Sequence, residues 1–387
     1  MKKKQKRKPA HGLPCALHWI VALALSSPLT SRQAWSQIIT DRNAPGQLRP
    51  TVLSTANGVP LVNIQTPSAG GVSLNRYSQF DIGPQGAVLN NSRKGASTQI
   101  GGAVPGNPHL ATGSARVIVN QVNSQHPSHL NGPIEVAGQR AEVIVANPAG
   151  IRANGASFIN ALGATLTTGV PVMSNGHLDA FRVTQGMVSI EGLGLDLSGA
   201  DHARILARAI EVNAGLWADH LTVLTGSNEV KALASGADAT ATPIAGTGSA
   251  PDFLLDVAAI GGMYARHIFL RGTDKGLGVN LDGTLATRKE MELLTDGRLV
   301  VKGSVHSDGH LSVKAAGIDN AAGAQIVARQ GLSVQTPGEL NNAGLVDGAN
   351  VSVQAALVHN TGRLYGDQLA ISAERVVNAE NAVIAAR

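Results

Sequence analysis

The sequence predicts an all-β fold: a right-handed parallel β-helix with an N-terminal cap and extra-helical loops. Three observations favour this fold. The 387 residues include 45 glycines but only 3% aromatic and 15% charged residues, a composition typical of short strands and tight turns. The C-terminal third repeats with a period of about 20 residues, which is typical of a solenoid. After the first 36 residues, no helical periodicity clearly exceeds about ten residues.

Residues 1–36 are predicted to be a signal peptide. A basic segment comes first, and residues 15–25 then form an apolar stretch that is too short for a permanent membrane anchor. Ala34 and Ser36 are small residues at the positions that a signal peptidase reads, so we expect cleavage near Ser36. The alternative is a helix that stays in the membrane, and His18 within the stretch argues against it.

The basic character of the chain belongs to this leader. The whole chain has 31 Lys and Arg against 26 Asp and Glu, and seven of the basic residues but none of the acidic ones precede residue 37. The remaining 24 basic and 26 acidic residues give a net charge of −2, which offers no electrostatic support for nucleic-acid binding. The single cysteine, Cys15, also lies in the leader, so the mature part has no disulfide.

The middle of the chain is predicted to form short strands separated by Gly, Asn, Asp or Pro. Residues 201–213 fit either a helix or a strand, and residues 227–256 are expected to form a loop excursion because they are rich in small residues without a pattern. The predicted strands are residues 116–122, 134–137, 141–146, 221–225 and 299–302.

Two elements recur in the C-terminal third. Apolar triplets with a central small residue occupy residues 311–313, 332–334, 351–353 and 369–371. Between them recur the asparagines Asn320, Asn342, Asn360 and Asn378. Asparagine tolerates left-handed backbone at corners, and stacked asparagine side chains can hydrogen-bond from one coil to the next. With allowance for loops, we expect about 14 to 17 coils at the spacing of sheet strands.

Four ordered blocks carry a family resemblance. They are Val62-Asn63-Ile64 with Gly71-Val72-Ser73 and Phe80; Asn90-Asn91-Ser92 with Ile100-Gly101-Gly102 and Asn107-Pro108-His109-Leu110; residues 141–151 with Asn154-Gly155 and Leu166-Thr167-Thr168-Gly169; and Gly262-Met263-Tyr264 with Gly276-Leu277-Gly278-Val279. Over residues 59–283 the chain resembles the secretion domain of filamentous-haemagglutinin and haemolysin-type two-partner secretion exoproteins. The resemblance implies a secretion domain at residues 37–283 and the start of a β-helical shaft at residues 284–387, which we expect to be truncated.

The two Asn-Pro turns are the candidate site. They comprise Asn107, Pro108, His109 and Leu110, and Asn147, Pro148, Ala149 and Gly150. The family usually has asparagine where this chain has His109 and Ala149. Proline fixes φ and Gly150 permits a tight reversal, so a turn-forming role follows from the residues themselves. Recognition by an outer-membrane transporter is what the resemblance implies for these turns.

Chemistry of other kinds finds little support. His306 and His310 flank Asp308 and Gly309, and a solvated turn explains them better than a metal site. Neither a serine elbow nor paired catalytic carboxylates are evident, so we expect no catalytic, cofactor-binding or metal site. Glycan binding usually needs aromatic platforms, and after residue 36 the chain has one tryptophan, Trp217.

The resemblance implies export by Sec and then by a cognate outer-membrane β-barrel with periplasmic POTRA domains, to the surface of a Gram-negative bacterium or the medium. The leading interpretation is a haemagglutinin-like surface adhesin that meets a host-cell or bacterial receptor. The alternative is the N-terminal part of a haemolysin or contact-dependent growth-inhibition toxin. A β-helical polysaccharide-degrading enzyme is a remote alternative.

Overall fold

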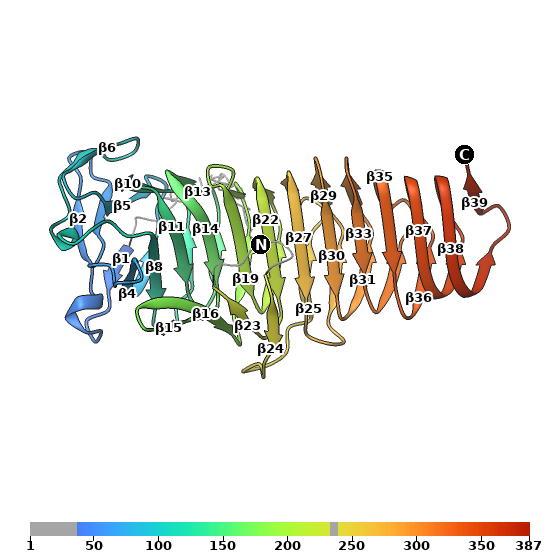
Figure 1. Cartoon of the computed structure of the whole chain (residues 1–387), viewed down its shortest axis with the longest axis horizontal. Helices are drawn as coiled ribbons and strands as arrows, with labels where there is room; N and C mark the ends of the chain where they lie inside the picture. The colour runs from blue at the N-terminus through green and yellow to red at the C-terminus, as the bar shows by residue number, and fades with distance from the viewer. Residues whose placement is uncertain (1–36, 233–238) are drawn as a thin grey trace, which may run out of the picture. The chain divides into compact units, whose positions relative to one another are not determined.

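The computed structural model describes residues 37–232 and 239–387, and they form a parallel β-helix (Figure 1). Within these ranges there is no α-helix, and the only helical turns are the two short 3₁₀ turns η1 (Gly46–Leu48) and η2 (Pro108–Leu110). No helix of these ranges is long and apolar enough to cross a membrane. The predicted fold class is confirmed. The predicted signal peptide and its cleavage site at Ser36 lie outside the described residues.

The turns of the β-helix form three faces, and each face is a sheet of parallel strands. Face 1 has one strand per turn, and each pairs in parallel with the strand of the next turn. Its strands are β4 (Val72–Asp81), β8 (Val117–Val122), β11 (Ala141–Ala146), β14 (Ala161–Thr167), β19 (His202–Ala207), β22 (His220–Thr225), β27 (His267–Gly272), β30 (Met291–Thr295), β33 (Leu311–Lys314), β35 (Gln325–Gln335), β37 (Leu345–Asn360) and β38 (Arg363–Asn378).

Face 2 follows face 1 within a turn. Its strands are β9 (Ser128–Leu130), β12 (Ile151–Ala153), β17 (Met187–Ile190), β20 (Ala209–Val212), β25 (Phe253–Val257), β28 (Gly278–Leu281), β31 (Arg298–Val301), β34 (Gly317–Asn320) and β36 (Glu339–Asn342). The C-terminal parts of β37 and β38 continue this face, because the last strands run around two corners without interruption.

Face 3 closes each turn. Its strands are β3 (Pro60–Asn63), β5 (Ala87–Asn91), β10 (Pro133–Gly138), β13 (Ala156–Ile159), β18 (Leu195–Asp196), β21 (Gly215–Trp217), β26 (Gly262–Ala265), β29 (Thr284–Thr287), β32 (Ser304–Ser307) and β39 (Val383–Ala386). The N-terminal parts of β35, β37 and β38 complete it before β39.

The solenoid has about 12 turns, one for each strand of face 1, and not the 14 to 17 predicted. The prediction was wrong because more of the chain than expected lies outside regular turns. The N-terminal cap, a hairpin before β8 and a second sheet beside face 1 all take up residues without adding a turn.

The N-terminal end of the stack is covered by antiparallel strands. β1 (Gln37–Thr40) pairs with β4, and β2 (Thr51–Ser54) pairs with β3. A hairpin of β6 (Ala96–Thr98) and β7 (Gly102–Val104) is held by the buried Glu135, whose carboxylate accepts hydrogen bonds from the backbone N–H groups of Gln99 (2.7 Å) and Ile100 (2.9 Å). Covering the first strands removes an open edge that could pair with another chain.

A four-stranded antiparallel sheet lies beside the solenoid (Figure 1), and we call it the side sheet. Its strands are β15 (Val170–Ser174), β16 (His177–Val183), β23 (Asn228–Lys231) and β24 (Ala241–Pro243). The last two belong to the predicted excursion at residues 227–256. Phe181 and Val230 of this sheet pack with Ile144 and Leu206 of face 1 in one apolar cluster, so part of face 1 is buried on both sides.

The C-terminal repeats stack in the register that the sequence indicates. Leu311 pairs with Leu332, and Leu332 with Val351. Asn320, Asn342, Asn360 and Asn378 form a ladder in which each Nδ2 donates to the Oδ1 of the next turn's asparagine, at 2.7 Å in all three steps. The first three side chains are buried, so these bonds satisfy amides that water does not reach. The predicted asparagine stacking is confirmed.

Candidate functional site

The turn that begins at Asn107 is built on the asparagine side chain. Its Oδ1 accepts the backbone N–H of His109 (3.0 Å), and its Nδ2 donates to the carbonyls of Ile64 (2.9 Å) and Asn90 (2.8 Å). The backbone N–H of Leu110 closes a β-turn on the Asn107 carbonyl (3.2 Å). Asn107 and Leu110 are buried, whereas Pro108 is exposed and His109 is half-buried.

The turn that begins at Asn147 repeats this design between β11 and β12. Asn147 Oδ1 accepts the backbone N–H of Ala149 (2.9 Å), and its Nδ2 donates to the His126 carbonyl (2.9 Å) and Ser128 Oγ (3.1 Å). Gly150 closes the β-turn on the Asn147 carbonyl (3.0 Å). Its φ of +121° lies outside the range that other residues readily adopt, which explains the glycine.

The third residue of each turn contributes its backbone N–H and not its side chain. Both His109 and Ala149 therefore suit a turn in which the family usually has asparagine. The two turns lie at different corners: the first packs on the capped N-terminal turns, and the second joins face 1 to face 2. In both, the asparagine points inward, and only the second and third residues are accessible to a partner.

The side sheet is anchored on face 1 by a buried arginine. Arg204 is 1% exposed; its Nε donates to Thr165 Oγ1 (3.0 Å) and its Nη1 to the carbonyl of Ala232, just after β23. Burial lowers the pKa of Arg204 to about 10, partly offset by the charge of Glu142, so the guanidinium is still charged at neutral pH. The sequence gives no signal for this anchor, because Ala232 lies within the excursion at residues 227–256, which has no sequence pattern.

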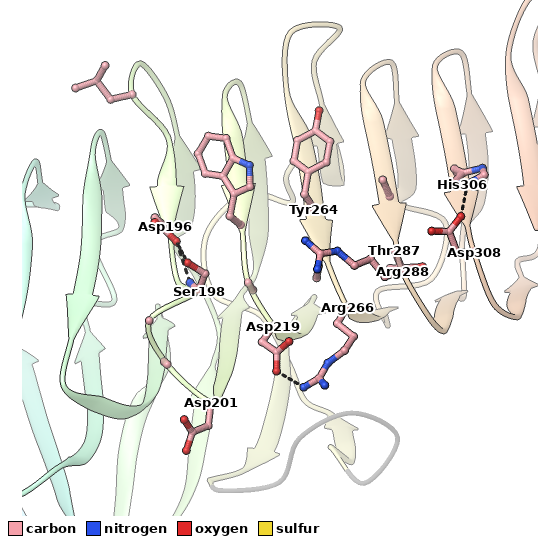
Figure 2. A pocket seen from close by; sticks show the side chains of 17 residues that line it. Asp196, Ser198, Asp201, Asp219, Tyr264, Arg266, Thr287, Arg288, His306 and Asp308 are labelled. Carbon is pink, nitrogen blue, oxygen red and sulfur yellow. Dashed lines mark hydrogen bonds and ion pairs between the residues drawn. The ribbon is translucent and has the colours of Figure 1, made fainter.

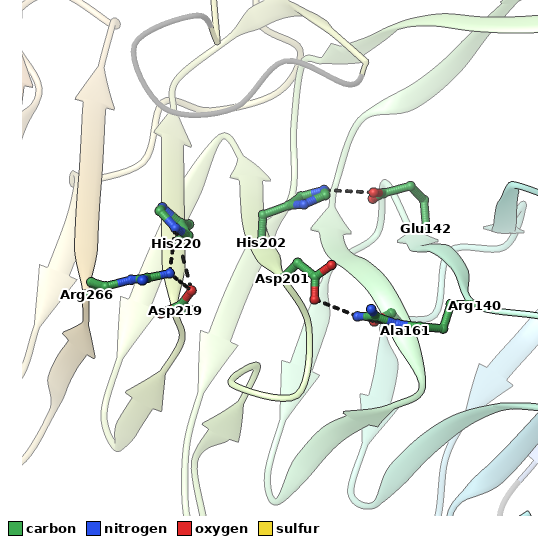
Figure 3. A network of polar contacts seen from close by, with 8 residues as sticks. All are labelled: Arg140, Glu142, Ala161, Asp201, His202, Asp219, His220 and Arg266. Atoms are coloured by element: carbon green, nitrogen blue, oxygen red, sulfur yellow. Dashed lines mark hydrogen bonds and ion pairs between the residues drawn. The ribbon is translucent and has the colours of Figure 1, made fainter.

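Glu142 also joins an ion pair that spans three turns of face 1 (Figure 3). Its Oε1 lies 2.8 Å from His202 Nε2, although Gly163 is their common neighbour in the middle strand. A Cβ atom at Gly163 would lie 2.3 Å from Glu142 Oε2 and 2.3 Å from His202 Nε2. The glycine therefore provides the space in which the two side chains meet.

Two histidines stack on the next turns of the same face. The rings of His220 and His267 are 4.6 Å apart and tilted by only 5°. Burial lowers the pKa of His267, and the positive charges of His220, Arg266 and Lys289 lower it further, while Glu290, 3.7 Å from His267 Nδ1, raises it. Asp219 lies 3.6 Å from His220 Nε2 (Figure 3).

Because of this histidine cluster, we expect the free energy of unfolding to depend on pH. A histidine with a lowered folded-state pKa is protonated in the unfolded chain first, so acidification through pH 6.5 favours unfolding. We therefore expect His267→Gln to lose less stability than the wild type between pH 7.5 and pH 5.5, as measured by urea midpoints. The control is His359→Gln, which changes an exposed histidine on face 2. Equal slopes for the His267→Gln variant and the wild type would contradict the prediction.

One feature of face 3 could not be predicted from the sequence. Trp217 is not an isolated aromatic residue, because Tyr264 pairs with it on the next turn and the two rings lie 6.3 Å apart. They line a groove with a volume of about 1150 Å³ (Figure 2). In this groove His306 Nε2 lies 3.1 Å from Asp308 Oδ1. Across residues 37–232 and 239–387, no group of three His, Cys, Asp or Glu residues could hold a metal ion.

A protein family model and a solved structure both match most of this chain. A family model described as the TPS secretion domain matches residues 36–313. The crystal structure of the filamentous hemagglutinin secretion domain is similar with a TM-score of 0.61 and 30% identity, covering 87% of this chain and 99% of that one.

Curated relatives extend the similarity to much longer proteins. Toxin CdiA of Yersinia pestis is 46% identical over 319 residues, which is 82% of this chain and 10% of the relative. The tRNA nuclease CdiA-2 of Burkholderia pseudomallei strain 1026b is 43% identical over 267 residues, or 68% of this chain and 8% of the relative. This chain thus spans about a tenth of their length. The capped solenoid and the match over most of its turns agree: the chain belongs to the TPS secretion domain family of two-partner secretion exoproteins.

Proposed function

We propose that this chain is the export region of a contact-dependent growth-inhibition toxin, carried to the Gram-negative cell surface by a cognate outer-membrane transporter. The match of residues 36–313 to a secretion domain is the observation that supports export. In this proposal, residues 1–36 direct the chain through Sec, residues 37–283 engage the β-barrel transporter and its POTRA domains, and residues 284–387 begin the shaft.

The relatives favour a toxin over the surface adhesin that the sequence first indicated. They are named as a toxin and a tRNA nuclease, whereas the similarity to the filamentous hemagglutinin secretion domain concerns the export region itself. The toxic activity would then belong to sequence outside the matched region, and the secretion domain would be non-catalytic. A receptor on a target cell is part of the same proposal.

The solenoid offers a physical route for export without a nucleotide. Each turn buries the apolar edge of the turn before it, and its strands complete hydrogen bonds that the previous turn left open. A chain that emerges unfolded and N-terminus first can therefore fold onto a preceding turn at the surface. The free energy of each added turn disfavours return through the transporter.

Deletion of residues 37–283 from a C-terminally tagged chain is expected to abolish secretion. The deleted chain should remain in the periplasm with its leader removed, while the wild type reaches the medium or the surface only when the transporter is co-expressed. The matched control deletes residues 332–387, outside the matched region, and should still be exported. Secretion of the first deletion, measured by immunoblot of medium and protease-treated cells, would refute the proposal.

The accessible residues of the Asn147 turn are proposed to contact the transporter. Ala149→Arg should reduce secretion at least about tenfold, which corresponds to about 1.4 kcal/mol of binding free energy. The turn itself uses only the backbone N–H of Ala149, so the urea midpoint of the refolded protein should be unchanged. The control is Ala322→Arg, at an exposed alanine of the turn before Gly323. Equal secretion of both variants would show that this turn is structural only.

A further inference from the structure

We propose that the groove around Trp217 and Tyr264 on face 3 binds a neutral oligosaccharide made of pyranose rings. The groove runs along successive turns of the solenoid, and its outward positions are in register: Asp196 pairs with Trp217, Trp217 with Tyr264, Tyr264 with Ala286, and Ala286 with His306. Figure 2 shows Asp196, Tyr264 and His306 on every second turn along this groove. This inference does not depend on the proposed export function.

The two rings lie nearly parallel on neighbouring turns, and we call them the platform. Their planes differ by 18° and their centroids are 6.3 Å apart. Trp217 is 43% exposed and Tyr264 is 39% exposed. Such partial exposure fits rings that cover the backbone with one face and present the other to solvent.

Glycines hold the rings in this position. A Cβ atom at Gly215 would lie 2.3 Å from Trp217 Cη2, and one at Gly262 would lie 2.7 Å from the Tyr264 hydroxyl oxygen. Each ring therefore lies over the glycine two residues before it on its own strand. Any larger residue there would push the ring away from the sheet and break the platform.

Polar groups surround the platform as a sugar requires. The Arg266 guanidinium pairs with Asp219 beside the rings, and Asp196, Arg288 and His306 lie along the groove (Figure 2). The C–H groups of a pyranose face pack on aromatic rings, while its hydroxyls both donate and accept hydrogen bonds. Carboxylate, guanidinium and imidazole groups together provide both roles.

The groove carries little net charge. Three of its carboxylates, those of Asp201, Asp219 and Asp308, pair with Arg140, Arg266 and Arg329. The remaining lining charges, those of Asp196 and Arg288, are opposite in sign. A groove without an excess of positive charge offers no electrostatic attraction to an anionic glycan, so its lining favours a neutral sugar. The competing explanation is that the rings merely shield two glycines of the sheet, an arrangement known to stabilise strands.

Isothermal titration calorimetry on the secreted full chain separates these explanations. The probes are cellohexaose, maltohexaose, isomaltohexaose and laminarihexaose, with a heparin-derived hexasaccharide as the anionic comparison. We expect at least one neutral hexaose to bind with a Kd on the order of 1 mM or lower. Trp217→Ala and Tyr264→Ala should each weaken that binding at least about tenfold, and Tyr264→Phe should keep it within about threefold.

Tyr365→Ala is the matched control, since Tyr365 occupies the same outward position of face 3 between Asp347 and Ala385, without an aromatic neighbour there. It should leave sugar binding unchanged. Absence of heat with every neutral hexaose at about 10 mM would overturn the proposal, as would tighter binding of the heparin fragment. Binding that survives Trp217→Ala in a folded protein, as judged by circular dichroism, would overturn it too.

Discussion

Arg204→Ala is expected to lower the free energy of unfolding by about 3–5 kcal/mol, because it removes a buried cation and leaves its partners without compensation. The Ala232 carbonyl and Thr165 Oγ1 would lose their donor in an interior that water does not reach. A cavity would also open between face 1 and the side sheet. Urea denaturation followed by the fluorescence of Trp217, on face 3 of the same turn as β19, measures the effect.

The matched substitution is Arg204→Met, which fills most of the same volume without a charge. Arg204→Met also leaves the Ala232 carbonyl and Thr165 Oγ1 without their donor, so it restores only the packing. We therefore expect Arg204→Met to be less destabilising than Arg204→Ala by about 1–2 kcal/mol, which is the part of the loss that comes from the cavity. Wild-type stability of Arg204→Met would show that the charge and hydrogen bonds of Arg204 do not hold the side sheet.

Asn342→Ala is expected to cost roughly 2–4 kcal/mol, because it breaks the asparagine ladder in its middle. Asn342 accepts from Asn320 (2.7 Å) and donates to Asn360 Oδ1 (2.7 Å) and to the Arg363 carbonyl (3.0 Å). Its removal leaves the buried Asn360 Oδ1 without a donor. Hydrogen exchange of the amides in residues 340–366 should rise together with the fall in the urea midpoint.

The neighbouring Asn341 supplies the control. Its side chain is half-buried and makes one bond, from Nδ2 to Asp319 Oδ1 (2.9 Å). Asn341→Ala should therefore change the free energy of unfolding by less than about 0.5 kcal/mol. Similar losses in both variants would show that the ladder adds nothing beyond ordinary surface hydrogen bonds.

The C-terminal turns could be predicted from the sequence because their strands alternate between inward apolar residues and outward polar residues. Leu311 and Val313 point into the core while Ser312 and Lys314 are less buried, and the next turn repeats the same alternation about twenty residues later. The asparagine spacing follows the same period, so both the strand register and the asparagine ladder can be predicted from the sequence. The outward residues Ser312 and Lys314 stay partly or fully exposed among the described residues, so burial does not obscure the alternation.

The ambiguity at residues 201–213 has a physical cause. The segment forms β19 and β20, and nearly all of β19 is buried because the side sheet covers its outer surface. A strand that is buried on both faces has no alternation to distinguish it from an apolar helix. The helix alternative is thus wrong, and the strand alternative is confirmed.

The aromatic pair could not be predicted from spacing. Trp217 and Tyr264 are neighbours across turns, but the excursion that forms β23 and β24 separates the two strands. Asp219 and Arg266, which also lie on these two neighbouring turns, are 47 residues apart in the sequence. Asn342 and Asn360 of the C-terminal ladder are only 18 residues apart. Only the recurring Gly-x-aromatic order in β21 and β26 signals the pair, and two occurrences do not establish a repeat.

The asparagine ladder also gives the stack a polarity. Besides its bond to the next asparagine, each Nδ2 of Asn320, Asn342 and Asn360 donates to a backbone carbonyl, which only the amino side of an amide can do. The amide dipoles therefore all point the same way along the corner. Each turn therefore presents an Nδ2–H donor to the Oδ1 atom of the asparagine in the next turn. At the other end, Val301 pairs in register with Asn320 and offers no donor, so Asn320 Oδ1 accepts nothing and the ladder begins there.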